Sequence, residues 1–385
     1  MTRQEIHAVL IISLIIALRL LGIFLILPIF SVYAMRYGGA TLPLVGLSFG
    51  VYALVQSILQ LPMGWASDRF GRKPILLAGL AMFTVGSLAC GFAGNIVQLI
   101  LARALQGSGA IGSVGMASLG DLTRPQVRTQ AFTITGIAVG STFVLGLLGG
   151  PLLAAHVGLG GVFYVLGVIG CLAFLITALL FPGIPVESHG GKPVSLKGII
   201  GRVEVRQLCI AAFILSFILN LFLFRYPLDW AALGVGQSRL WKIYLLVFLP
   251  TLFLVFPYIR YAESRGDLRT PTQMGWALMT GCFIYYLAGG LGRTVLYVTG
   301  IAFFLGYTLF QPVLPSFLTQ MVSEEQRGTA IGIYNLASFL GASVGGILAG
   351  TLSHFTRILP SVAGLALLLA WLLVGFPKQP ESTPH

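Results

Sequence analysis

The chain has 385 residues, of which 57% are hydrophobic and only 9% are charged. Soluble globular domains carry about 25% charged residues, so this composition excludes that class and indicates a membrane protein. In a soluble protein the net charge of +12 would suggest a nucleic-acid partner. Here the basic residues lie in short segments between apolar runs, so we attribute them to membrane topology and expect no nucleic-acid partner.

Apolar runs long enough to cross about 30 Å of hydrocarbon follow one another along the chain. The first is too long for a signal-peptide core and lacks a small-x-small cleavage site, so we expect it to be retained as a helix. Six runs precede a polar segment and six follow it. The predicted spans are 8–30, 44–63, 74–93, 95–118, 130–154, 160–182, 207–228, 240–260, 271–289, 294–317, 329–352 and 359–376.

This division predicts two domains. Residues 1–182 form an N-terminal six-helix bundle, 183–206 form a cytoplasmic linker, and 207–385 form a C-terminal six-helix bundle. If the N-terminus lies inside, the loops on that side hold fifteen Lys and Arg residues against five on the other. Basic residues favour the cytoplasmic side. We therefore expect a multi-pass protein of the inner (plasma) membrane with both termini in the cytoplasm.

The polar stretch between the second and third spans reads Gly64-Trp-Ala-Ser-Asp-Arg-Phe-Gly-Arg-Lys73. A tight turn needs its glycines but does not need four charged residues close together. The pattern resembles the signature loop between helices 2 and 3 of the major facilitator superfamily. This resemblance implies twelve transmembrane helices in two pseudo-symmetric six-helix bundles, and a secondary transporter that works by alternating access. The alternative is a positive-inside loop that only fixes topology.

The resemblance also implies a conformational latch. In relatives the acid after span 4, here Asp121, pairs with the last arginine of the signature loop, here Arg72. The loop aspartate, Asp68, would lie near the start of helix 11, around Gly328–Gly332, where the helix macrodipole favours a carboxylate. The alternative for Asp121 is a solvated loop acid. The predicted latch comprises Gly64, Asp68, Arg69, Gly71, Arg72, Lys73 and Asp121.

Spans 4 and 5 carry two further motifs. Arg103-Ala-Leu-Gln-Gly-Ser-Gly resembles the second motif of the superfamily, whose arginine faces the cavity or a proton path. A dinucleotide site is rejected for the Gly-x-Gly-x-x-Gly in this run, because no strand precedes it. The span-5 glycines resemble the motif of the drug:proton antiporter branch, and we expect them to let span 5 pack closely while the proline bends its end. They are Gly136, Gly140, Gly146, Gly149, Gly150 and Pro151.

The chain as a whole is similar to the YajR-type transporters of that branch. Asp121-Leu-Thr-Arg and Leu314-Pro-Ser316 add to the likeness. Two departures are visible. We expect no extra C-terminal domain, because the chain stops a few residues after the last span. Many relatives place an acid just before the Leu-Pro-Ser of span 10, where this chain has Gln311, so no span-10 acid is available for proton coupling.

Ionisable residues inside spans are costly and point to function. Arg19, Arg103 and Arg225 lie within predicted spans, and Asp229 follows Arg225 by four residues, where it would pair. Because Arg19 and Arg103 have no carboxylate in their spans, we expect the N-terminal half of the cavity to be positive and the substrate to be neutral or anionic. The alternative is that both arginines bind helix carbonyls. Further cavity or coupling candidates are Tyr52, Gln56, Gln60, Gln106, Asn220, Tyr307, Gln311, Tyr334 and Asn335.

The leading functional hypothesis is proton-coupled efflux of a small amphipathic molecule through the lipid bilayer. The alternative is a copper importer of the same superfamily, for which Met279 and Cys282 on span 9 are a weak signal. A membrane enzyme is disfavoured, because no His-Glu-x-x-His and no clustered His/Asp set lies at a span end. The four cysteines fall inside apolar runs and indicate core packing. We expect a monomer without cofactor or metal.

Overall fold

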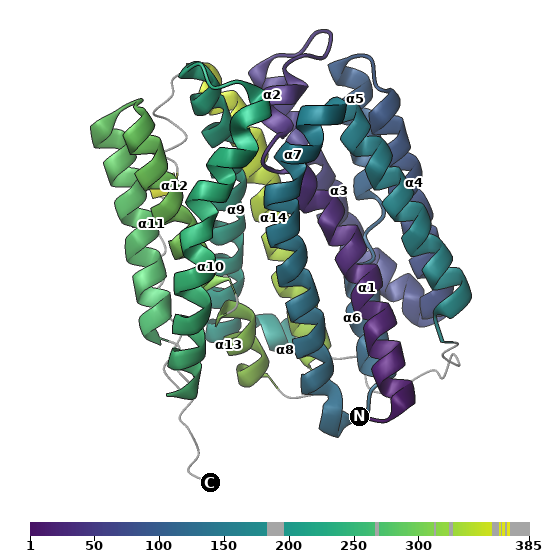
Figure 1. Ribbon diagram of the computed structural model, residues 1–385. Coiled ribbons are helices and arrows are strands. Elements are labelled where there is room, and N and C mark those ends of the chain that lie inside the picture. The colour runs from purple at the N-terminus through teal and green to yellow at the C-terminus, as the bar shows by residue number, and fades with distance from the viewer. Residues whose placement is uncertain are drawn as a thin grey trace. The chain divides into compact units, whose positions relative to one another are not determined.

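The computed structural model describes residues 1–182, 196–265, 269–311, 313–322 and 326–355, together with 362, 364, 365, 368 and 369. These residues are helical apart from short connections, and the only β-bridge among them joins Gly38 and Asn95. The chain divides into two compact units, Met1–Lys192 (unit 1) and Pro193–His385 (unit 2) (Figure 1). Eight helices in the described part are long and apolar enough to cross a membrane. The predicted span 359–376 and the linker residues 183–195 lie mostly or wholly outside it.

Unit 1 begins with a capped helix. The Thr2 hydroxyl accepts a hydrogen bond from the Glu5 amide, and the Glu5 carboxylate accepts one from the Thr2 amide, so two of the free amides at the helix start are satisfied. Aliphatic side chains of this first helix then form a core with the helices around it. The helices of unit 1 are α1 (Arg3–Ile26), α2 (Phe30–Ala34), α3 (Leu42–Phe70), α4 (Arg72–Phe92), α5 (Ile96–Gly107), α6 (Gly112–Asp121) and α7 (Pro125–Leu180).

The residues 64–73, predicted as a loop, are helical except for Gly71. Helix α3 continues to Phe70, and α4 begins at Arg72, so a single residue separates them. That residue is Gly71, whose φ of 94° is a conformation that a side chain strongly disfavours. The charged residues of the signature stretch therefore lie on the ends of two helices, and the turn between them is one residue long.

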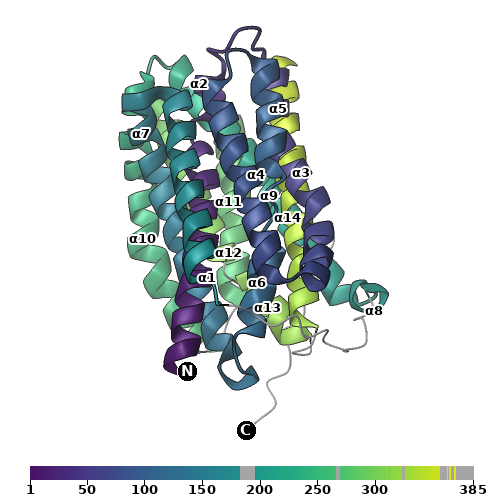
Figure 2. The same cartoon turned by 90° about the vertical axis from the view of Figure 1, so that its right-hand side faces the viewer.

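The predicted span 95–118 is not one helix. It breaks between α5 and α6, which lie near the top and the bottom of the view in Figure 2. Two glycines flank this break where other backbones come close: a Cβ on Gly107 would be 2.4 Å from the Tyr52 carbonyl oxygen, and one on Gly109 would be 2.5 Å from the Gly79 carbonyl oxygen. The predicted spans 130–154 and 160–182 are joined in α7 and separated by a kink at Gly158, whose φ is 68°.

Unit 2 has helical residues within the predicted linker 183–206. Helix α8 lies within this segment, and α9 begins at Val203, four residues before the predicted start of its span. The predicted span 294–317 is also divided, because α12 ends at Phe310 and α13 begins at Val313. The helices of unit 2 are α8 (Leu196–Ile200), α9 (Val203–Ala232), the 3-10 helix η1 (Gln237–Arg239), α10 (Leu240–Ser264), α11 (Arg269–Gly289), α12 (Arg293–Phe310), α13 (Val313–Met321) and α14 (Arg327–Phe355).

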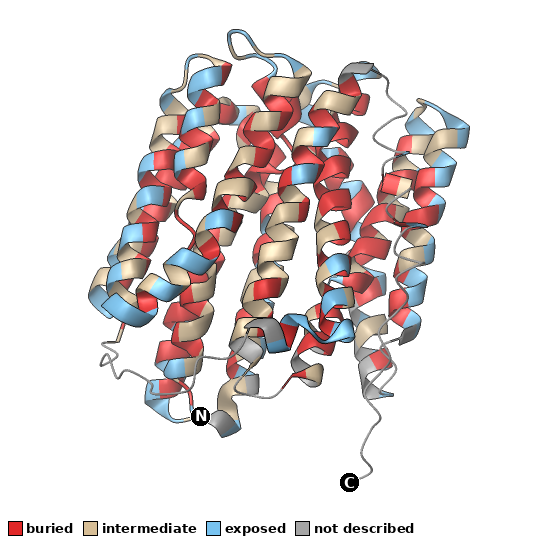
Figure 3. Cartoon of the chain, turned by 180° about the vertical axis from the view of Figure 1, so that it is seen from behind, coloured by how far each residue is buried: buried red, intermediate tan, exposed pale blue. Residues whose placement is uncertain are grey.

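Each unit has a glycine-mediated helix pair. In unit 1 a Cβ on Gly150 of α7 would stand 2.0 Å from the Leu25 carbonyl oxygen of α1. In unit 2 a Cβ on Gly341 of α14 would stand 2.1 Å from the Phe213 carbonyl oxygen of α9. The first and fifth spans of one unit and the corresponding spans of the other thus pack backbone to backbone, as small residues allow in membranes. Burial follows stripes along the helices, with exposed residues on their other faces (Figure 3).

The span-5 glycine prediction needs correction in part. Gly146 and Gly150 make close helix contacts, and a Cβ on Gly149 would meet the Leu25 side chain at 3.5 Å. A Cβ on Gly136 or Gly140 would meet nothing within 4 Å, so neither is needed for packing in this structure. Pro151 lies inside α7, and the residue with non-helical angles is Gly158 instead.

Candidate functional site

The signature stretch is organised around the guanidinium group of Arg72. Its Nε donates to Asp121 Oδ2 at 2.8 Å, and its Nη1 donates to Ser67 Oγ at 2.6 Å and to Asp68 Oδ1. These contacts tie the end of α3 and the start of α4 to the last residue of α6. The Arg72–Asp121 pair that the resemblance implies is present.

The other signature residues have separate partners. The Arg69 guanidinium lies over the rings of Trp65 and Phe70, at 5.7 and 5.6 Å from their centres. Lys73 Nζ donates to the Phe181 carbonyl oxygen at 3.5 Å, just past the end of α7. The Gly64 carbonyl oxygen accepts a 2.7 Å hydrogen bond from Ser67 Oγ. The expected approach of Asp68 to Gly328–Gly332 joins the two units and stays a prediction.

Sequence reasoning missed a second ion pair in unit 1. Arg124, directly before α7, donates from Nε to Glu5 Oε1 at 2.8 Å and from Nη2 to Glu5 Oε2 at 3.2 Å. The Thr2-x-x-Glu5 capping box is visible in the sequence and predicts where Glu5 lies. No local signal identifies its partner, which is 119 residues away.

Unit 1 buries two arginines inside its helices. Arg19 of α1 is 3% exposed, and its Nε donates to the Gly109 carbonyl oxygen at 2.9 Å. Arg103 of α5 is 4% exposed, lies 4.4 Å from the centre of the Tyr52 ring, and donates to Gln106 Oε1. Gln106 in turn donates to Ser87 Oγ at 2.8 Å.

No carboxylate in the described part of unit 1 neutralises these arginines. Its three acids have other partners, because Glu5 pairs with Arg124, and Asp68 and Asp121 both pair with Arg72. Among the described residues, the two buried positive charges are therefore held by carbonyl, amide and aromatic groups.

One face of α3 carries four polar residues, one per turn, that we call the α3 ladder: Ser48, Tyr52, Gln56 and Gln60. All four are buried. Within the described protein, the two hydroxyls and all four side-chain amide atoms of the ladder have no hydrogen-bond partner. Buried polar groups are nearly always paired with protein or with ordered water, so this cluster is a candidate for a bound ligand or water.

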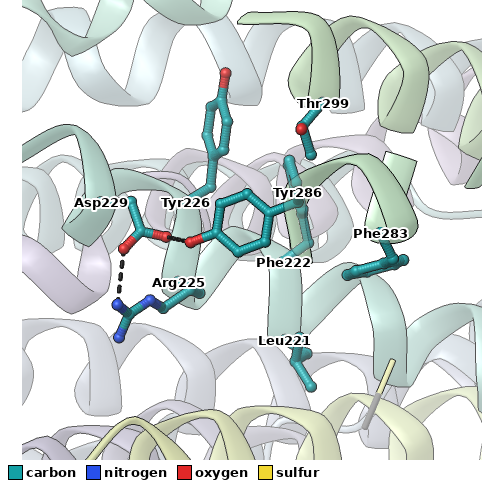
Figure 4. A pocket seen from close by; sticks show the side chains of 8 residues that line it. All are labelled: Leu221, Phe222, Arg225, Tyr226, Asp229, Phe283, Tyr286 and Thr299. Carbon is teal, nitrogen blue, oxygen red and sulfur yellow. Dashed lines mark hydrogen bonds and ion pairs between the residues drawn. The ribbon is translucent and has the colours of Figure 1, made fainter. Parts of the chain in front are cut away.

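In unit 2 the buried arginine has its own carboxylate. Arg225 Nη2 lies 2.8 Å from Asp229 Oδ1, one turn further along α9, and the Tyr286 hydroxyl donates to Asp229 Oδ2 at 2.5 Å (Figure 4). Asp229 is 1% exposed. The three side chains border a cavity of about 20 Å³, which admits a water molecule but not a drug-sized ligand. Its other lining residues are Leu221, Phe222, Tyr226, Phe283 and Thr299.

The sequence model of the Major Facilitator Superfamily matches residues 12–346. The chain belongs to this superfamily. Its fold is therefore the all-α major facilitator fold with twelve transmembrane helices in two six-helix bundles, and the chain is a multi-pass membrane transporter rather than an enzyme.

Relatives and solved structures agree with this assignment. The chain is 32% identical to the inner membrane transport protein YajR of Escherichia coli (strain K12), over 93% of this chain and 80% of that one. It is 25% identical to the quinolone resistance protein NorA of Staphylococcus aureus (strain MRSA252), over 92% of each chain. A crystal structure of a D-xylose-proton symporter matches with a TM-score of 0.76 at 14% identity, covering 99% of this chain and all of that one, which shows the shared fold.

The remaining predicted residues of this superfamily member lie apart from the Asp229 cavity. Asn220 Nδ2 donates to the Ser216 carbonyl oxygen within α9, Tyr307 stacks on Phe303, and Gln311 is exposed at the end of α12. Tyr334 and Asn335 are half-buried on α14. Of the residues proposed for copper, the Cys282 thiol donates to the Met279 carbonyl oxygen at 3.1 Å.

Proposed function

We propose that the protein is a secondary active transporter that exports a small amphipathic molecule across the inner (plasma) membrane by alternating access, in exchange for protons. The observation that carries this proposal is similarity over nine-tenths of the chain to a transporter named for quinolone resistance. Resistance to a drug implies movement out of the cell. The similarity to an inner membrane transport protein supports the location.

Arg72 and its two acids act as the latch in this proposal. The guanidinium group joins three helix ends, so any motion of α4 against α6 must stretch or break the Arg72–Asp121 pair. The Asp68 side chain is 65% exposed and keeps one oxygen for a second partner. The superfamily resemblance gives that partner as the start of α14, whose helix dipole would favour the carboxylate.

Asp229 is the proton carrier in this proposal. It is a buried carboxylate on a spanning helix, and its cavity has room for the water that would deliver a proton. Arg225 Nη2 lies 2.8 Å from the carboxylate while the pair is closed, so the arginine and a proton are alternative partners of Asp229 in this proposal. When the pair separates, the buried carboxylate takes up a proton, so its protonation follows the conformational cycle.

Uptake by proteoliposomes tests the proposal. Purified protein is reconstituted with an acidic lumen, and a fluorescent quinolone is added outside at neutral pH. We expect accumulation that a protonophore abolishes and that Asp229→Asn uncouples from the pH gradient. Accumulation that ignores the gradient in the natural protein would contradict proton exchange. If the protein accelerates the uptake of no compound in a panel of amphipathic molecules, the result would contradict efflux.

Topology belongs to the same proposal. Both termini and the segments 64–73, 183–206 and 261–270 lie in the cytoplasm, as the excess of basic residues favours. Single cysteines at 192 and 265 in a cysteine-free background should resist an impermeant thiol reagent in right-side-out vesicles and react once the vesicles are opened. Labelling of either cysteine in sealed vesicles would show that these segments lie outside, which is the opposite of the proposed orientation.

A further inference from the structure

The break between α5 and α6 brings polar groups of three helices together. Arg19 of α1 reaches the break through its bond to the Gly109 carbonyl oxygen. Gln60 of α3 lies against the first residue of α6, since a Cβ on Gly112 would stand 3.1 Å from Gln60 Nε2. Ser113 Oγ donates to the Gln60 main-chain oxygen at 2.9 Å, which fixes α3 against this point.

Several donors at this place are unused. Arg19 Nη2 and Gln60 Nε2 are buried without a hydrogen-bond partner in the described protein. Helix α6 has ten residues and no side-chain cap at its start. The free amides of its first turn carry the positive end of the helix dipole. Arg19 contacts the break at Gly109, and Gln60 contacts it three residues later, at Gly112, where α6 begins.

The positive charge of Arg19 and the positive end of the α6 dipole favour the binding of an anion. Arginine stays protonated in proteins, and the acids of unit 1 in the described part of the chain are committed to Arg72 and Arg124. A buried cation without a counter-charge is costly in a membrane, and an incoming negative group would lower that cost. An incoming cation would add to it.

We propose that this point, defined by Arg19, Gln60 and Gly112, is the subsite that binds the carboxylate of the transported substrate. The substrate is then an amphipathic monocarboxylic acid, and this assignment depends on the transport function proposed above. One carboxylate oxygen accepts from Arg19 Nη2, and the other accepts from Gln60 Nε2 and the first-turn amides of α6. Gln56 and Tyr52, the next two members of the α3 ladder, are available to polar groups further along the molecule.

Three naphthalene probes of one shape test the subsite in purified full-length protein: 2-naphthoate, 2-naphthamide and a 2-naphthylmethyl-ammonium salt. Affinity is measured by isothermal titration calorimetry at pH 7. A charged hydrogen bond contributes about 1.5–3 kcal/mol, so naphthoate should bind about ten- to a hundredfold more tightly than the amide. Arg19→Gln should bring the two affinities to within about twofold, through loss of naphthoate affinity alone.

A pair of glycine variants on α6 provides a test without a change of charge. The new methyl group of Gly112→Ala presses on Gln60 Nε2 and should weaken naphthoate binding about fivefold or more. Gly120→Ala, on the same helix with nothing within 4 Å of the new Cβ, should bind as the natural protein does. These variants decide the question even if Arg19→Gln fails to fold.

The proposal is overturned if the amide or the ammonium probe binds as tightly as naphthoate, or if Gly112→Ala and Gly120→Ala bind it equally. Neither result depends on transport, because binding is measured without a gradient. Carboxylate binding at this subsite in a protein that shows no gradient-driven transport would instead contradict the function and leave the subsite standing.

Discussion

The two units bury arginine in different ways. Arg225 in unit 2 has a carboxylate one turn away and a tyrosine that completes the cluster, so its charge is balanced within the protein. Arg19 and Arg103 in unit 1 are held by a carbonyl, an amide and aromatic rings, with no acid in the described part of the unit available to them. A balanced pair can change its charge only by taking or losing a proton. An unbalanced cation is best neutralised by a ligand. In the proposed mechanism the proton is therefore carried in unit 2, and the substrate is bound in unit 1.

The largest expected effect comes from breaking the balanced pair. Asp229→Asn leaves the Arg225 charge buried without a counter-charge, which typically costs about 3–5 kcal/mol. We expect a large fall in Tm. Unfolding is measured in detergent by the fluorescence of the tryptophans. Arg19→Gln should cost much less, because no carboxylate loses its partner.

The double variant Arg225→Leu/Asp229→Leu is the control for this comparison. Replacing a whole buried pair with apolar side chains is often neutral or stabilising, so most of the lost stability should return. If Asp229→Asn and Arg19→Gln lower Tm equally, the two units do not differ in the way described.

Glycine packing should give effects of intermediate size that are alike in both units. Gly150→Ala and Gly341→Ala place a methyl group about 2 Å from a backbone oxygen that cannot rotate away. Overpacking of this kind costs about 1–3 kcal/mol, and we expect similar losses of thermal stability from both variants. Gly140→Ala is the matched control on α7, since its Cβ meets nothing. It should be neutral or stabilising by up to about 1 kcal/mol, because Ala is the better helix former. A harmless Gly150→Ala would show that the α1–α7 contact is looser than described.

The smallest effect on stability is expected at the latch. Asp121→Asn removes one partly exposed partner of Arg72, worth about 1 kcal/mol or less. Transport should nevertheless fall several-fold, because a change of this size shifts a balanced conformational equilibrium. The transport rate is measured in proteoliposomes. The control is Glu204→Gln, which changes an exposed acid on α9 that is not part of the latch. If Asp68→Asn and Asp121→Asn both transport at the natural rate, the signature stretch only fixes topology.

The sequence predicted most of the apolar spans in the described part of the chain and the Arg225–Asp229 pair, because hydropathy and an i,i+4 spacing are local signals. The Arg72–Asp121 pair was implied by the family resemblance. The sequence did not predict the break in span 4. The close contacts of Gly107 with the backbone of α3 and of Gly109 with the backbone of α4 are tertiary contacts, which a local pattern does not show. The Glu5–Arg124 pair was missed for the same reason, since its members meet only through tertiary packing. Three members of the α3 ladder, Tyr52, Gln56 and Gln60, were predicted as single residues, and Ser48 was missed. Only the structure shows that the polar atoms of the ladder are buried without hydrogen-bond partners among the described residues.

Transport of the charge-matched probes tests the central claim most directly. Proteoliposomes holding the natural protein or Arg19→Gln, with a fixed pH gradient, are given 2-naphthoate, 2-naphthamide or the 2-naphthylmethyl-ammonium salt, and initial rates are measured. We predict that the natural protein moves naphthoate fastest and the cation slowest, and that Arg19→Gln loses this order while Arg36→Gln, at an exposed arginine, keeps it. A natural protein that transports the cation fastest, or an Arg19→Gln variant with an unchanged order of rates, would contradict the account.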